Sequence, residues 1–93
     1  MTVWVIKKST EFERDDGRFH LFTCDVAVAD THEAAIKKMR DEGEFYLTDV
    51  THGGGTVVKE SDYIMQIITN ESSRRRRITY NIYKRSTDED SFI

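Results

Sequence analysis

Residues 72–85, Ser-Ser-Arg-Arg-Arg-Arg-Ile-Thr-Tyr-Asn-Ile-Tyr-Lys-Arg, are the stretch of this sequence best suited to bind a charged ligand. The run holds six of the 14 Lys and Arg residues, and no acid occurs from Ser72 to Thr87. Guanidinium and ammonium groups neutralise phosphates, and a tyrosine ring can stack on an unpaired base. The pattern therefore indicates contact with RNA. The candidate residues are Arg74, Arg75, Arg76, Arg77, Tyr83, Lys84 and Arg85, joined by Lys7 and Lys8 if the first and last strands are neighbours.

The second half of this run has the alternation of a β-strand, which decides which side chains face outward. Ile78, Tyr80 and Ile82 would share one face and suit a core. We expect the opposite face to present its arginines together, on a surface without neighbouring carboxylates, because charges are not buried without partners. Two alternatives stay open: an acidic protein partner, or a solvated strand whose arginines pair with Glu71 or with the acidic residues near the end of the chain. The outward set is Arg75, Arg77, Thr79, Asn81, Tyr83 and Arg85.

No catalytic motif accompanies the basic run. The segment His52-Gly53-Gly54-Gly55 is similar to the oxyanion-hole glycines of esterases, but the sequence has no Gly-x-Ser-x-Gly nucleophile and no Lys-Ser/Thr ending of a phosphate loop. A glycine-rich hairpin tip explains this segment better. The pairs Asp15–Asp16 and Asp88–Asp90 fall in a turn and in a tail, where we do not expect the burial that acid–base catalysis requires.

The three histidines, His20, His32 and His52, have no metal-ligand spacing, and the one cysteine, Cys24, adds no cluster. We expect Cys24 to be a small core residue. The sequence thus predicts a protein without catalysis, metal or cofactor.

Ninety-three residues with a net charge of −3 indicate one domain, which we place at residues 1–87, followed by a mobile acidic tail at 88–93. A lone cysteine suits the cytoplasm. We expect no signal peptide and no membrane span, because no long apolar run occurs.

Five strands and one helix are predicted from the pattern of apolar residues. The strands are residues 2–12, 18–29, 44–51, 56–69 and 74–85. For the fourth, a bend near Glu60 and Ser61 and a short helix within 60–69 are left open. Asp-Gly at 16–17 predicts a hairpin, and Phe22, Cys24, Val26 and Val28 are expected to face the core. The helix is expected to be capped by Asp30, with Glu33 completing a capping box, and to end at Gly43.

This order predicts an α+β fold: a five-stranded, mainly antiparallel sheet with one helix on one face, in the order β-β-α-β-β-β. Short turns predict a meander in chain order, with the first strand inside the sheet. One short helix cannot cover five strands. We therefore expect the bare face to be polar, to meet a partner, or to pair with a second copy as a homodimer.

Two segments resemble parts of small bacteriophage-encoded anti-defence proteins: Val3-Trp4-Val5-Ile6 at the first strand and Asp30-Thr31-His32-Glu33-Ala34-Ala35 at the helix start. Within that group the chain is similar to RNA-binding inhibitors of ToxN-type ribonuclease toxins. The resemblance covers the first half of the chain and carries over no individual site residue. It implies a non-enzymatic protein that binds RNA and acts against a host protein in the cytoplasm of a bacterial cell.

The function expected from the sequence is a non-enzymatic, RNA-binding inhibitor of a bacterial defence or regulatory factor, with phosphates bound along the C-terminal basic strand. The alternative is a protein-only interaction module that uses the open sheet face or the acidic region 30–62. A third hypothesis is a small hydrolase that uses His52 or Cys24. Such an enzyme would need a cleft that a domain of this size can barely form.

Overall fold

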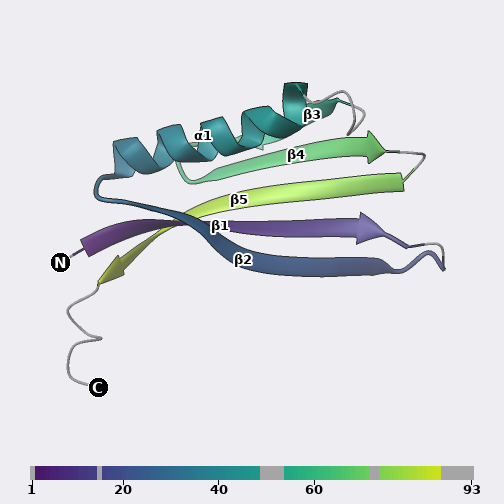
Figure 1. Ribbon diagram of the computed structural model, residues 1–93, viewed down its shortest axis with the longest axis horizontal. Helices are drawn as coiled ribbons and strands as arrows, with labels where there is room; N and C mark the ends of the chain where they lie inside the picture. The colour runs from purple at the N-terminus through teal and green to yellow at the C-terminus, as the bar shows by residue number, and fades with distance from the viewer. Residues whose placement is uncertain (1, 15, 49–53, 72–73, 87–93) are drawn as a thin grey trace, which may run out of the picture.

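The computed structural model describes residues 2–14, 16–48, 54–71 and 74–86. A five-stranded antiparallel sheet carries one helix, as Figure 1 shows, so the predicted fold class and element order are confirmed. The elements are β1 (Thr2–Glu13), β2 (Phe19–Ala29), α1 (His32–Thr48), β3 (Gly55–Glu60), β4 (Ile64–Glu71) and β5 (Arg74–Ser86).

The strands lie in the spatial order β2-β1-β5-β4-β3, which differs from the predicted meander. Hairpin β1–β2 and the β3–β4–β5 unit join through β1 and β5, which pair antiparallel from Thr2↔Ser86 to Phe12↔Arg76. The reason is the helix, which carries the chain across the sheet so that β3 enters at the far edge and β5 returns to the centre. As expected, β1 is an inner strand and the first and last strands are neighbours.

The turn between β1 and β2 is the predicted tight hairpin. Gly17 has a φ of +80°, a backbone conformation that a glycine adopts without strain. Its amide donates to the carbonyl of Arg14 at 3.0 Å, and the amide of Arg18 donates to the Asp16 carboxylate at 3.0 Å.

The residue that caps the start of α1 lies one position later than predicted. The Thr31 hydroxyl accepts a hydrogen bond from the amide of Ala34 at 3.1 Å, and its carbonyl accepts from the amide of Ala35 at 3.0 Å. Thr31, not Asp30, therefore satisfies the first free amides of the helix, as hydroxyl residues at this position commonly do.

The end of α1 also differs, because the predicted strand 44–51 is wrong over its described part. The helix continues to Thr48, and its buried stripe runs through Ala35, Met39, Gly43 and Tyr46. Gly43 does not end the helix: a Cβ there would lie 2.7 Å from the Met65 sulfur, so the residue permits close helix–sheet packing. Residues 49–51 lie outside the described part of the chain.

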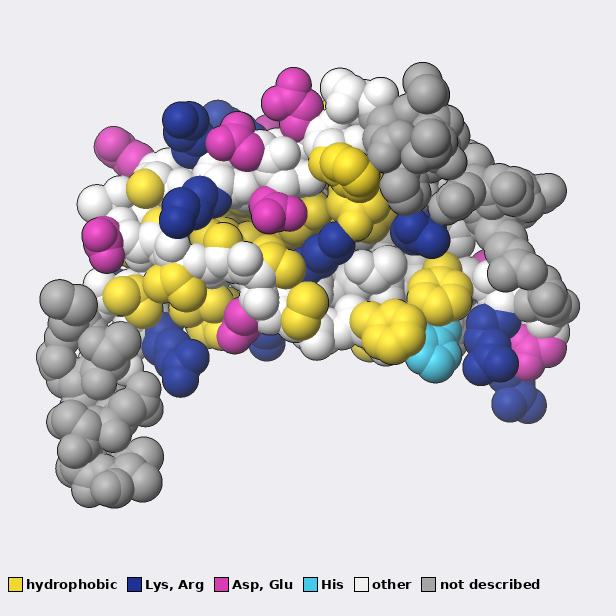
Figure 2. All heavy atoms as spheres, in the orientation of Figure 1, with side chains coloured by type: hydrophobic (Ala, Val, Ile, Leu, Met, Phe, Trp, Pro, Cys, Tyr) yellow, Lys and Arg dark blue, Asp and Glu magenta, His cyan; other side chains and the backbone are white. Residues whose placement is uncertain are grey.

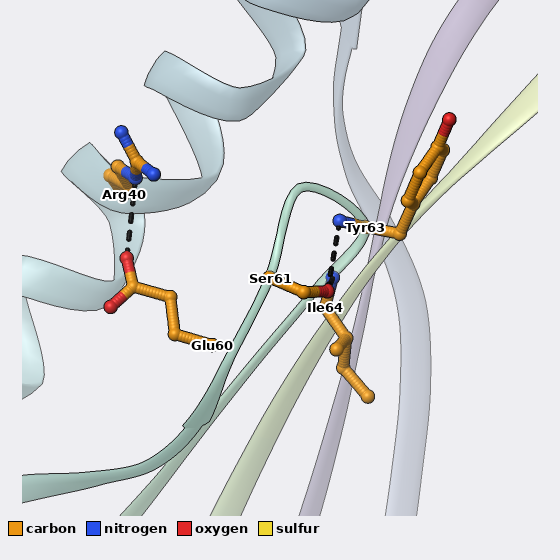
Figure 3. Close-up of polar contacts among 5 residues, drawn as sticks. All are labelled: Arg40, Glu60, Ser61, Tyr63 and Ile64. Carbon is orange, nitrogen blue, oxygen red and sulfur yellow. Dashed lines mark hydrogen bonds and ion pairs between the residues drawn. The ribbon is translucent and has the colours of Figure 1, made fainter.

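The region predicted as one extended stretch, 56–69, is a hairpin of two strands with no helix in it. Ser61 makes the turn, shown in Figure 3: its hydroxyl accepts hydrogen bonds from the amides of Tyr63 and Ile64, each at 3.2 Å. Glu60, just before the turn, pairs with Arg40 of α1 at 3.2 Å and ties the hairpin to the helix.

A β-bulge in β2 changes which of its side chains face the core. Ile6 pairs with Ala27 and Lys7 with Asp25, so Val26 is an extra residue in the ladder. The alternation shifts at that point: Ala29 is buried, whereas Val28 is 51% exposed on the face away from the helix. The predicted core set is thus mostly wrong. Of its members only Val26 packs against the core, while Phe22, Cys24 and Val28 are exposed.

The core lies between α1 and the inner halves of the strands, and the predicted core face of β5 is confirmed: Ile78, Tyr80 and Ile82 are buried. The helix crosses the sheet from Trp4, whose ring stacks on His32, to Gly55, beside the Tyr46 carbonyl. It does not reach the outer ends of β1 and β2, which extend beyond it (Figure 1). We call the face under α1 the helix-side face and the other the open face.

Candidate nucleic-acid interface

The nine candidate residues divide between the two faces of the sheet, because successive side chains of a strand alternate. The open face receives Arg75, Arg77, Tyr83, Arg85 and Lys7, and the helix-side face receives Arg76, Lys84 and Lys8. Arg74 pairs through its backbone with Glu71, and its side chain lies outside what the structure describes. The run is contiguous in sequence but does not form one surface.

On the open face, carboxylates from neighbouring strands lie beside the candidate residues. Arg77 Nη1 lies 3.9 Å from Glu11 Oε2 of β1. The Tyr83 hydroxyl donates to both carboxylate oxygens of Asp25, each at 3.2 Å. The expectation of a carboxylate-free arginine surface is therefore wrong for this face. The acids come from β1 and β2, whose position beside β5 the local sequence of the run does not reveal.

Tyr83 is also less suited to stack a base than expected. The ammonium of Lys7 lies 5.3 Å from the centroid of its ring. Burial, followed by the hydrogen bond to Asp25, raises the pKa of the Tyr83 hydroxyl. This tyrosine is thus held by two neighbours in the sheet.

On the helix-side face, the two lysines contact aromatic side chains of the fold. The Lys8 ammonium donates to the Tyr46 hydroxyl of α1 and lies 4.6 Å from the centroid of that ring. Lys84 Nζ lies 5.6 Å from the ring of Trp4. Both distances suit cation–π attraction, so these lysines help to join elements together.

The outer part of the helix-side face carries three neighbouring aromatic rings that were not predicted from the sequence. The ring centroids of Phe12 and His20 lie 5.4 Å apart, those of Phe12 and Phe22 5.7 Å, and those of His20 and Phe22 4.5 Å. Phe22 is 57% exposed. The register of the hairpin brings them together, since Phe12 is opposite His20 and Thr10 opposite Phe22. The Asp-Gly turn, with aromatic residues spaced evenly on either side of it, was the signal that could have revealed them.

Arg76 extends this cluster, because it lies opposite Phe12 on β5 and points to the same face. We call Phe12, His20, Phe22 and Arg76 the outer patch. Figure 2 shows hydrophobic surface flanking a histidine on the sheet beyond the helix. Among the described side chains, none that β1, β2 or β5 directs to this outer part of the face is acidic; Glu11 and Glu13 point to the open face.

The remaining candidates do not come together within the described ranges. Cys24 is exposed, opposite Lys8, and not the core residue that we expected. His20 and His32 lie in two separate ring clusters, and His52 is outside the described residues. No group of three His, Cys, Asp or Glu side chains there could hold a metal ion. An open hollow of about 350 Å³ beside α1 is lined by Ala27, Lys38, Asp41 and Glu42.

No family model, curated protein or solved structure matches this chain.

In the part of the chain that the structure describes, no helix has the length and apolar character to cross a membrane. The predicted tail at 88–93 lies beyond the described residues.

Proposed function

We propose that this chain binds RNA without catalysis, and that the outer patch is where the RNA lies. The observation that carries the proposal is the exposed ring of Phe22, which packs beside Phe12 and His20 on the outer part of the sheet, with Arg76 opposite Phe12. A cation supplies attraction for phosphate, and an exposed ring supplies a surface for a base. On the open face, Glu11 and Asp25 oppose the approach of a phosphate.

The test compares two neighbouring arginines on opposite faces. Arg76→Gln and Arg77→Gln each remove one charge from adjacent positions of β5, and binding of a fluorescently labelled RNA is measured by anisotropy over a range of salt concentrations. Loss of one phosphate contact lowers the slope of log K against log salt by about 0.7 for a single strand. We expect this change for Arg76→Gln and a smaller one for Arg77→Gln, whose guanidinium is 3.9 Å from Glu11.

A triple variant tests the open face as a whole. Replacing Arg75, Arg77 and Arg85 with Glu reverses three charges there. If the triple variant abolishes binding and Arg76→Gln has no effect, RNA lies on the open face and our placement is wrong. If the unaltered protein retains no RNA even at low salt, the proposed function itself is rejected.

A second candidate is a protein-only interaction module on the open face, and the mixture of charges there favours it. Charges of both signs lie beside exposed apolar residues there: Arg77 and Glu11 near Leu21, and Lys7, Tyr83 and Asp25 nearer Val28. This mixture suits the polar and apolar surface of a protein better than a polyanion. This candidate gains if the purified protein carries no nucleic acid by its ultraviolet absorbance ratio and nuclease leaves its complexes intact. The inhibitory role in a bacterial host that the resemblance implies stays a prediction.

A further inference from the structure

Strand β2 forms one edge of the sheet, and its outer side pairs with no strand that the structure describes. Natural edge strands are usually short or carry lysine, other charges or proline, which prevent pairing with another chain. The opposite edge follows this rule, because β3 has 6 residues and ends in Lys59 and Glu60. In contrast, β2 has 11 residues with no lysine, arginine or proline, and Asp25 is its one acid. This edge is therefore suited to receive a further strand.

The accessible part of this edge is residues 19–25, which we call the open segment. At its inner end, Lys38 of α1 donates to the Val28 carbonyl at 2.7 Å, and the bulge at Val26 interrupts the regular pairing with β1. At its outer end β2 meets the hairpin turn. Because α1 does not reach the outer ends of β1 and β2 (Figure 1), the helix leaves room for a strand beside the open segment.

Side chains of the open segment are compatible with the same segment of a second copy. Leu21 on the open face is 59% exposed and Phe22 on the helix-side face is 57% exposed, and a neighbouring strand would remove part of both from water. In the antiparallel register that overlaps the whole segment, Phe22 lies opposite Phe22 of the other copy, and Asp25 lies opposite Phe19. Two copies therefore meet along this segment without like charges opposite each other.

We propose that β2 of one copy pairs antiparallel with β2 of a second copy through the open segment, and that the two five-stranded sheets join into one continuous sheet. The two-fold axis passes beside Phe22 and is perpendicular to the sheet, so both helices lie on the same face. The two Phe22 side chains are then cross-strand neighbours, with Cβ atoms about 5 Å apart.

This inference goes beyond the proposed function and does not depend on it. It places the outer patches of the two copies side by side on one face, so a surface for RNA would continue from one copy to the other. It differs from the homodimer expected from the bare face of the sheet, because the contact is made by the edge of a strand.

Sedimentation velocity over a wide range of protein concentration, without RNA, measures the association. A contact along one short strand buries less than the roughly 1,200–2,000 Å² of a standard interface, so we expect a dissociation constant on the order of 10 µM. Amide hydrogen exchange followed by NMR identifies the surface. The β2 amides that point away from β1 should exchange slowly at high protein concentration and fast at low concentration, because pairing with a second copy protects them.

Charges introduced at Phe22 test the register. Phe22→Lys and Phe22→Glu should each raise the dissociation constant about tenfold, because the ring contact is lost and like charges then lie opposite each other. An equimolar mixture of the two variants should associate more tightly than either alone, since opposite charges then face each other. Val58→Lys is the matched control: Val58 is 49% exposed on β3, the other edge strand, and its substitution should leave association unchanged. Circular dichroism of each variant checks the fold.

Four outcomes overturn the inference, and each is distinct from a failure of RNA binding. The first is a monomer at every concentration. The second is protection of the β2 amides that does not change with concentration, which shows that a segment of the same chain covers the edge. The third is a dimer dissociated by Ile68→Lys, on the open face, and not by Phe22→Lys. The fourth is a mixture of the two Phe22 variants that associates no better than either alone, which shows that Phe22 does not face itself.

Discussion

Two clusters of three aromatic rings lie near opposite ends of β1, and each has a histidine in it. Trp4, His32 and Tyr63 stack with centroids 4.5 Å apart at each step, and the rings come from β1, α1 and the turn before β4. The Nε2 of His32 also donates to the Asp62 carbonyl at 2.7 Å. This inner cluster joins segments far apart in the sequence.

The outer cluster of Phe12, His20 and Phe22 comes from one hairpin, and among the described residues no ring of another element stacks on it. Its rings have similar spacing, but α1 does not cover them. The comparison teaches that stacking alone does not distinguish a structural cluster from a binding surface. The distinction lies in how many elements the rings connect.

The largest expected contrast is in the cost of removing one ring from each cluster. Trp4→Ala deletes a partly buried side chain that contacts both the core and His32, and should lower the free energy of unfolding by about 2–4 kcal/mol. Phe22→Ala should cost under about 1 kcal/mol, because most of that ring is already in water. Urea denaturation of both variants measures the difference, and equal costs would remove the distinction between the clusters.

Substitution of the two histidines should also lower stability by different amounts. The larger loss is again expected in the inner cluster, and the difference between the two should be smaller than for Trp4 and Phe22. His32→Ala loses two ring contacts and a hydrogen bond to the backbone, for about 1–2 kcal/mol. His20→Ala should change stability by about 0.5 kcal/mol or less. Thermal unfolding at one pH provides the measurement, and His32→Phe serves as a control that keeps the stacking and loses only the hydrogen bond.

The smallest expected change in the free energy of unfolding comes from Lys84, whose ammonium lies beside the Trp4 ring of the inner cluster. Lys84→Gln removes the ammonium 5.6 Å from the Trp4 ring and should cost about 0.5 kcal/mol, while Lys84→Arg should restore it. If Lys84→Gln instead weakens RNA binding as strongly as Arg76→Gln, the ligand extends along the helix-side face toward the inner cluster, contrary to our placement.

Much of the fold could be predicted from the sequence because local pattern and final environment agree. In β5, alternation alone identified Ile78, Tyr80 and Ile82 as core residues. The end of α1 could not be predicted in this way: Phe45, Tyr46 and Leu47 have strand propensity, and only packing against β4 determines that Gly43 lies inside a helix. The bulge at Val26 is likewise a property of the pairing with β1, invisible in β2 alone.

The candidate site could be predicted only in part, for a related reason. The basic run is a local feature, but whether its charges meet acids depends on which strands lie beside it. Glu11 is 66 positions away from Arg77 and lies opposite it in the sheet, whereas the same register places Phe12 opposite Arg76. One residue of alternation thus separates an arginine beside Glu11 from one on the opposite face beside Phe12.

The extra residue at Val26 also determines how this hairpin could change in length. Inside the bulge, Ala27 and Ala29 hold β2 against Ile6 and Trp4; outside it, the arms pair regularly up to the turn. Two residues inserted into each arm would move the tip outward by about 7 Å and leave the core ladder as it is. A single insertion would exchange the faces of Leu21 and Phe22. Insertion of an even number of residues into each arm is therefore compatible with the fold, and insertion of an odd number is not.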